Sequence, residues 1–206
     1  ISGMIEFITY LRSQSHERVY SVATGKEYTS FREYIVRDSK AKFSTVENNE
    51  HAHALLGEIK NTLSDPNKLQ AFDDGQNTLV HGDLIMHNIL VGGEKITGVL
   101  DWEFAFWGDP DYDLARILYY EECAKVYEEG VDIIQEHDYL TRLTTTVARS
   151  CITHKDIFKK KYDIFRASFY LRALSWAVAS DSPEKNVNEL TQNWAKKRAE
   201  RKTAQP

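Results

Sequence analysis

Short β-branched runs interrupt a chain whose apolar residues otherwise follow helical spacing. Thr78-Leu79-Val80, Ile89-Leu90-Val91 and Lys95 to Leu100 have the composition of strands, and Gly92-Gly93 is typical of a two-residue hairpin turn. Apolar positions spaced three and four residues apart cover most of the remaining chain. The sequence therefore predicts an α+β, mainly helical fold with a small β-hairpin region.

The helices are predicted from apolar periodicity together with start and stop signals. Ser13 to Tyr28 is polar and is expected to form a loop. In the first half of the chain, the expected helices are Met4 to Leu11, a short one over Thr29 to Val36, and one that begins at the capping box Ser44-x-x-Glu47 and ends at Ser64-Asp65-Pro66. In the second half, one helix is expected after Asp109-Pro110-Asp111, ending near Gly130, and two more within Val131 to Ser180. A last helix is expected to begin at Ser182-Pro183.

The length, charge and cysteine content of the chain argue against several classes of function. The 206 residues are the length of one domain and can bury a core without disulfides or a structural metal. A net charge of -5 gives no basic surface for a nucleic acid and suits a cationic ligand better. No apolar run approaches the length of a membrane-spanning helix, and Cys123 and Cys151 form no metal-binding or disulfide spacing. A reducing cytoplasm with no membrane partner is the expectation.

Three polar residues stand where the predicted strands end. Asp83, Asn88 and Asp101 supply the groups that phosphoryl transfer needs: a carboxylate to hold an acceptor hydroxyl, and oxygen ligands for nucleotide-bound magnesium. The hairpin between Asn88 and Asp101 would bring these distant positions together. Each residue alone fits equally well as a strand or turn cap, so the hypothesis depends on the whole set.

The complete pattern H-G-D-x-x-x-x-N, D-W-E and G-D-P-x-x-D-L-A, within Val80 to Ala115, resembles the aminoglycoside phosphotransferase and choline kinase group of the protein-kinase-like fold. The resemblance implies that Asp83 is the catalytic base and that His81 shapes the catalytic loop. It implies that Asn88 and Asp101 bind the nucleotide through Mg²⁺. It gives Asp113 a structural role, tying the following helix to that loop.

The resemblance also implies an architecture and a reaction. Residues 1–206 would be a single domain, the C-terminal, substrate-binding and catalytic lobe. Ile1-Ser2-Gly3 resembles the hinge between lobes, and no phosphate-covering loop or strand lysine of a β-lobe is found, so that lobe is expected in the full-length protein. The expected activity is transfer of the γ-phosphate of ATP, or of another nucleoside triphosphate, to a hydroxyl of a small molecule.

Some positions keep two interpretations. Glu103, two residues beyond Asp101, would face the same side of an extended segment and could hold a second magnesium, or it is an exposed carboxylate. The aromatic residues that follow are expected mainly in the core, although stacking on a substrate is open; they are Trp102, Phe104, Phe106 and Trp107. Carboxylates that either contact an acceptor or form a solvated helix face are Glu121, Glu122, Glu128 and Glu129.

Two other functions remain open from the sequence. The first is a non-catalytic small-molecule-binding or interaction module on the same scaffold, favoured by the absence of a β-lobe pattern. The second is a metal-dependent phosphoesterase in which His81, Asp83, His87 and Asp101 hold two metals and activate water. The lack of further histidine and aspartate clusters weighs against this second function.

Overall fold

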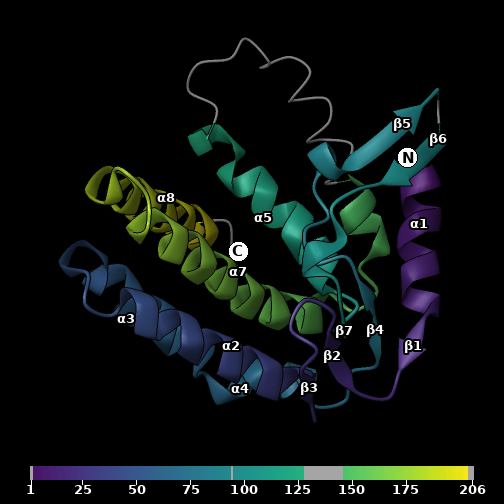
Figure 1. The fold of residues 1–206 in the computed structure, drawn as a ribbon, viewed down its shortest axis with the longest axis horizontal. Coiled ribbons are helices and arrows are strands. Elements are labelled where there is room, and N and C mark those ends of the chain that lie inside the picture. The colour runs from purple at the N-terminus through teal and green to yellow at the C-terminus, as the bar shows by residue number, and fades with distance from the viewer. Residues whose placement is uncertain (1, 94, 128–145, 204–206) are drawn as a thin grey trace.

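The computed structural model describes residues 2–93, 95–127 and 146–203 (Figure 1). Helices and two small sheets alternate along the chain, as the sequence predicts. The helices are α1 (Ser2–Ser13), α2 (Phe31–Val46), α3 (His53–Leu63), α4 (Pro66–Leu69), α5 (Tyr112–Tyr127), α7 (Lys155–Val178) and α8 (Pro183–Thr203), and residues 146–151 are also helical. Gly130 and residues 131–145 lie outside the described residues. No helix in the described ranges is long and apolar enough to cross a membrane.

A five-stranded antiparallel sheet was not predicted. It consists of β1 (Ser15–His16), β2 (Val19–Ser21), β3 (Glu27–Tyr28), β4 (Asn77–Val80) and β7 (Phe106–Gly108), in the order β1-β4-β7-β2-β3. Three of these strands lie in the segment that was predicted as a loop, and that prediction was wrong. Strands of two or three residues are too short to show alternation. Here β1 pairs with β4 and β2 pairs with β7, more than fifty residues away, while β3 pairs with β2 at the edge of the sheet.

The start of α2 also differs from the prediction. Ser30 caps α2, and its Oγ accepts a hydrogen bond from Glu33 N at 3.1 Å. Ser44 lies inside the same helix, where its hydroxyl donates to a carbonyl one turn earlier. The capping-box pattern occurs at both serines, and the apolar run after Ser30 makes the first the true start. The short helix expected there therefore continues to Val46.

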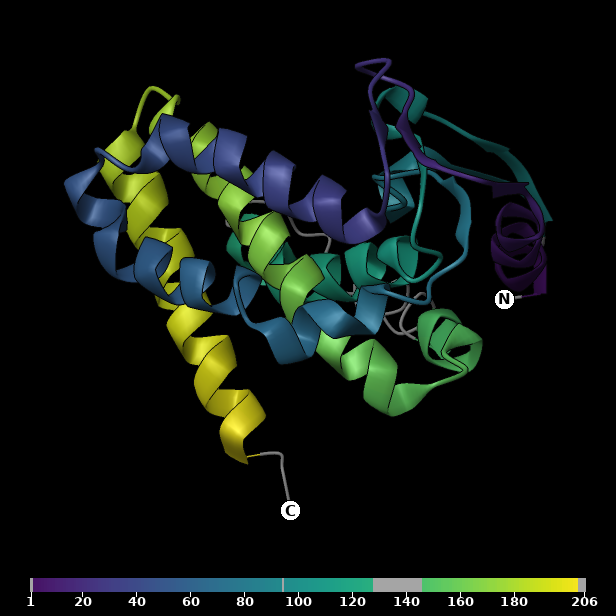
Figure 2. The same cartoon turned by 90° about the horizontal axis from the view of Figure 1, so that it is seen from below.

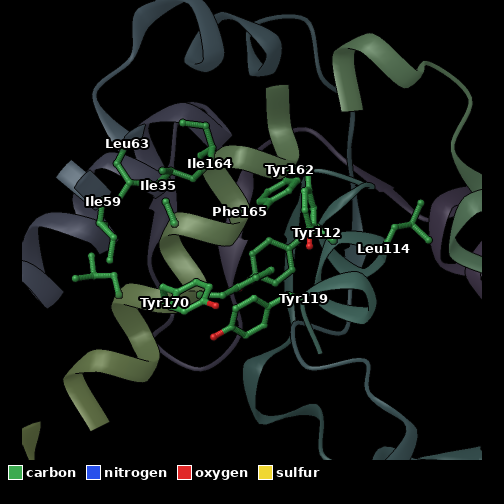
Figure 3. Close-up of a cluster of buried hydrophobic side chains, with 14 of the residues drawn as sticks. Ile35, Ile59, Leu63, Tyr112, Leu114, Tyr119, Tyr162, Ile164, Phe165 and Tyr170 are labelled. Carbon is green, nitrogen blue, oxygen red and sulfur yellow. The ribbon is translucent and has the colours of Figure 1, made fainter. Parts of the chain in front are cut away.

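The core is centred on α7. This helix packs against α2, α3, α5 and α8, and Figure 2 shows it lying between α2 and α8 on the helical side of the molecule. Aromatic rings from α5 and α7 meet inside the core. The ring centroids of Phe165 and Tyr112 lie 5.3 Å apart in an edge-to-face contact (Figure 3). Aliphatic side chains of α2 and α3, such as Ile35 and Ile59, cover the other side of α7.

The predicted hairpin is present as a separate two-stranded sheet of β5 (Ile89–Gly92) and β6 (Lys95–Val99). Figure 1 shows it beside α1, at the end of the molecule away from α3 and α8. Ile89 pairs with Val99, so the two ends of the hairpin meet. The polar residues that flank it are therefore brought together.

Candidate active site

His81 is the first residue after β4, and its side chain is fully buried. Its Nε2 lies 2.8 Å from Leu100 O, and Asp83 N donates to its Nδ1 at 3.3 Å. These contacts require a neutral ring with the proton on Nε2. The ring also packs against Trp102, with 4.6 Å between centroids. His81 therefore joins the loop after β4 to the end of β6.

Asp113, in the first turn of α5, holds the same loop from the other side. Its Oδ2 accepts from His81 N at 2.8 Å and its Oδ1 accepts from Gly82 N at 3.0 Å. Burial raises the pKa of the Asp113 carboxyl, and the two backbone donors oppose this by favouring the ionised form. The two bonds fix the position of the loop relative to α5.

Gly82 lies where the loop passes closest to the segment after β6. Its φ is +83°, and a Cβ on this residue would lie 2.2 Å from Phe104 O. A side chain is excluded both by the left-handed backbone and by the neighbouring carbonyl.

Asp83 is held by Arg116 of α5. Arg116 Nη2 and Nε lie 2.7 and 2.8 Å from the same oxygen, Asp83 Oδ1, and both side chains are only 15% exposed. The guanidinium also lies 5.5 Å from the ring centroid of Tyr119 and 5.6 Å from that of Phe169. Asp83 Oδ2 has one long contact, 3.4 Å from Asn88 Nδ2. One oxygen of Asp83 is thus fixed while the other stays available.

Asn88 connects this carboxylate to the hairpin. Its Nδ2 donates to Asp83 O at 3.0 Å, and its own backbone oxygen accepts from Leu100 N at 2.8 Å. Asp101 is the next residue after Leu100. The contacts therefore bring Asp83, Asn88 and Asp101 to one end of the hairpin, as the sequence predicted.

Asp101 has a strained backbone. Its φ and ψ are both 63°, and it is the one residue other than glycine with positive φ in the described part of the chain. This conformation costs roughly 1–2 kcal/mol for an L-residue, although aspartate tolerates it better than most. Strain of this kind is concentrated at functional positions, where the surrounding structure imposes it. Here it turns the chain sharply from β6 into the 3₁₀ turn Trp102–Phe104.

The arrangement fits magnesium that arrives with a nucleotide. In the described ranges, neither Asn88 Oδ1 nor the Asp101 carboxylate has a hydrogen-bond or ion-pair partner. Such oxygens are the ligands Mg²⁺ prefers, usually one or two from the protein with phosphate oxygens and water completing the shell. No group of three His, Cys, Asp or Glu residues among the residues described could hold a metal by itself.

The interpretation of Glu103 needs correction. Trp102–Phe104 forms a 3₁₀ turn, so the extended alternation that would place Glu103 on the side of Asp101 does not exist. The aromatic prediction is also wrong in part, because Phe106 is buried whereas Phe104 and Trp107 are half-buried and Trp102 is 36% exposed. Glu121 and Glu122 lie in α5 without described side chains, and Glu128 and Glu129 lie outside the described residues.

A buried ion network anchors the start of α5. Lys161 Nζ of α7 lies 2.8 Å from Asp109 Oδ2 and 3.1 Å from Asp111 Oδ2, and Arg12 of α1 pairs with Asp111 Oδ1 at 2.8 Å. Burial raises the pKa of Asp109 to about 6, although Lys161 opposes the shift. The helix that carries Asp113 and Arg116 is thus fixed to both α1 and α7.

Sequence reasoning missed Arg116. The available signal was its spacing from Asp113, because residues three apart lie on the same face of a helix. Asp113 holds the loop backbone and Arg116 holds the Asp83 side chain, so one face of α5 positions the whole segment.

Comparisons with known proteins agree with this geometry. The model of the family described as "Phosphotransferase enzyme family" (APH) matches residues 47–140, a range that contains the loop after β4 and the hairpin. Hygromycin-B 4-O-kinase from Escherichia coli is 35% identical over 51 residues, which are 25% of this chain and 15% of that protein.

Solved structures of aminoglycoside phosphotransferase APH(4)-Ia share the fold. A thermostable variant in ternary complex with AMP-PNP and hygromycin B superposes with a TM-score of 0.63 and 17% identity, over 93% of this chain and 62% of that one. The apo form of a thermostable variant gives 0.58 and 17%, over 87% and 55%. The chain thus corresponds to little more than half the length of these structures. The chain is thus similar to the APH phosphotransferase enzyme family over residues 47–140, and it shares the fold of APH(4)-Ia over most of its length.

Proposed function

We propose that this chain is the catalytic and substrate-binding lobe of an ATP-dependent phosphotransferase that transfers the γ-phosphate to a hydroxyl group of a small molecule. The observation that carries the proposal is the convergence of Asp83, Asn88 and Asp101 at one end of the β5–β6 hairpin. Phosphoryl transfer needs positioning and charge stabilisation more than covalent chemistry, and these residues supply the groups for both.

Asp83 is the proposed base. Its Oδ2 can accept a hydrogen bond from the acceptor hydroxyl and take its proton, because Arg116 occupies only Oδ1. Arg116 is a positioning residue in this scheme, since two donors on one oxygen fix the rotation of the carboxylate. His81 and Asp113 act through the backbone by holding the loop in place.

The nucleotide would bind on the exposed side of the hairpin. Leu90 pairs with Gly98, and Leu100 lies two residues beyond Gly98, so both leucines share one face. They are 46% and 47% exposed and form an apolar platform next to Asn88 and Asp101. A nucleotide base suits such a platform, while Asn88 and Asp101 would hold Mg²⁺, which neutralises phosphate charge when bound.

Glu103 remains a further candidate magnesium ligand only if the turn at Trp102–Phe104 rearranges.

In the full-length protein a β-lobe is expected to cover the nucleotide. ATP is the proposed donor because a related structure contains AMP-PNP, and that structure also contains hygromycin B. An aminoglycoside-type or related hydroxyl compound is the proposed acceptor, and a cationic one would suit the net charge of -5.

The phosphoesterase alternative fits the structure poorly. His81 is buried and both of its ring nitrogens have partners, so it cannot bind a metal without breaking the loop. His87 Nδ1 lies 3.2 Å from Tyr120 Oη in an exposed contact. The non-catalytic binding module keeps the same fold and is separated from the kinase by experiment.

Isothermal titration of the 206-residue chain, first with Mg²⁺-AMP-PNP and then with an aminoglycoside panel, tests the proposal. Asp101→Ala is the test variant, and Asp74→Asn, an exposed carboxylate away from the hairpin, is the matched control. Nucleotide binding lost only in Asp101→Ala, together with phosphate transfer from γ-labelled ATP, supports the kinase. Acceptor binding without any nucleotide binding, also when a β-lobe is restored, would show the non-catalytic module instead.

A further inference from the structure

A groove lies between α2 and α3, which are consecutive helices in the chain. These helices lie at the end of the molecule away from the hairpin (Figure 1). Its volume is about 780 Å³, within the range of small-molecule sites. None of its lining residues comes from the segment 80–116. Its apolar wall is formed by Val36, Phe43, Leu56, Leu63 and Leu69.

Three polar groups of this groove lack partners among the described residues. Ser39 lines it, is 4% exposed, and its Oγ has no hydrogen-bond partner in the described part of the structure. Lys40 of α2 and Lys60 of α3 line it from its two walls, and neither has an ion-pair partner among the described residues. A buried hydroxyl without a partner is uncommon in native proteins. The groove therefore offers two cations next to an apolar surface, and the unpaired Ser39 hydroxyl is buried in its wall.

Gly57 gives the groove its width. It lies in the middle of α3, where glycine destabilises a helix by roughly 0.5–1 kcal/mol relative to alanine. A Cβ on Gly57 would meet no atom within 4 Å, so the fold does not require glycine at this place. Any larger side chain here would project into the groove and reduce its volume.

We propose that the groove binds an amphipathic organic monoanion, such as a carboxylate with a hydrocarbon body. The carboxylate would lie between Lys40 and Lys60. The hydrocarbon body would extend toward Val36 and Leu63. Glu47 lines the opposite end, where its negative charge disfavours the anionic group. This site is independent of phosphate transfer and would be present even if the proposed function were wrong.

Dodecanoate below its micellar concentration is the probe, with the neutral 1-dodecanol as its matched control, and binding is measured by isothermal titration to the full chain. The double variant Lys40→Gln/Lys60→Gln should bind dodecanoate about tenfold more weakly than the wild type does. Its affinity for dodecanol should equal that of the wild type. Gly57→Phe should abolish binding of both, because the ring fills the groove. Gly57→Ala should retain binding, since one methyl group meets no neighbour.

Three results would contradict the proposed anion site, each for a different reason. Dodecanoate binding that survives Gly57→Phe, in a variant whose thermal unfolding stays cooperative, would show that the anion binds elsewhere. Equal loss of dodecanoate and dodecanol in the lysine double variant would show that charge plays no part. A dimer in sedimentation analysis that Gly57→Phe converts to a monomer would assign the groove to a second copy of the chain and overturn the proposal.

Discussion

The loop that follows β4, residues 81–88, differs from the α2–α3 groove in how many of its polar groups have partners. Around Asp83 the buried polar groups have partners: both ring nitrogens of His81, both carboxylate oxygens of Asp113, and one oxygen of Asp83 itself. In the groove, Ser39 and the two lysines have none among the described residues. Fixed groups suit chemistry that depends on geometry, whereas unpaired groups suit recognition of a ligand that supplies the partners. Substitutions should therefore have large effects in the first region and small ones in the second.

The largest expected effect is that of Asp83→Asn on turnover. A general base typically contributes about 10²–10⁴ in rate, so kcat should fall by that factor while the KM for the nucleotide changes little. Steady-state kinetics of phosphate transfer, with Asp74→Asn as control, measures it. A change in KM alone would mean that Asp83 binds substrate without acting as a base.

Gly82→Ala tests how rigid the catalytic loop is. The substitution should destabilise the fold by about 4 kcal/mol, at the upper end for a single change, because the new Cβ collides with Phe104 O and the φ is left-handed. Gly25→Ala is the matched control, with φ +66° and open space around it, and should cost only about 1 kcal/mol. Denaturant unfolding measures both variants. Equal losses would show that the loop relaxes easily and that the comparison with the groove is wrong.

The ion network under α5 predicts a pH dependence of stability. The pKa of Asp109 is about 6 in the folded chain against an ordinary value of 3.8, so the folded state keeps the proton longer than the unfolded state. The resulting stabilisation is complete below about pH 3.8 and is lost as the pH rises through 6, a change of about 3 kcal/mol. Asp109→Asn should remove this part of the pH dependence, which urea unfolding from pH 4 to 7 measures. Parallel curves for the wild type and the variant would show that Asp109 titrates normally.

Much of the catalytic-loop region could be predicted from the sequence because its signals are local. The strand composition around Gly92-Gly93 located the hairpin, and the spacing from Asp83 to Asn88 matched a single turn. The five-stranded sheet could not be found in this way, because β1 and β2 are defined by partners far along the chain. Arg116 was missed for a similar reason, since its role depends on where α5 packs.

The sequence contains almost no signal that predicts the groove. Lys40 and Lys60 look like ordinary exposed helix residues, and no sequence pattern marks Ser39 as buried. Gly57 is the one local hint, as a glycine inside a helical pattern without a turn nearby. A pocket between two helices depends on their relative placement, which the periodicity of either helix does not specify.

The smallest expected effect belongs to Ser39→Ala, and its sign separates the two regions most clearly. Removing a buried hydroxyl without a partner ends a desolvation cost, and alanine also has the higher helix propensity, so stability should rise by about 0.5 kcal/mol. In α5, Asp113→Ala should instead lower stability, because the buried N–H groups of His81 and Gly82 lose their acceptor. Thermal unfolding of the two variants measures both signs. If Ser39→Ala is destabilising, the hydroxyl already has a partner in solution, and the groove would then lack the unsatisfied group that favours a ligand.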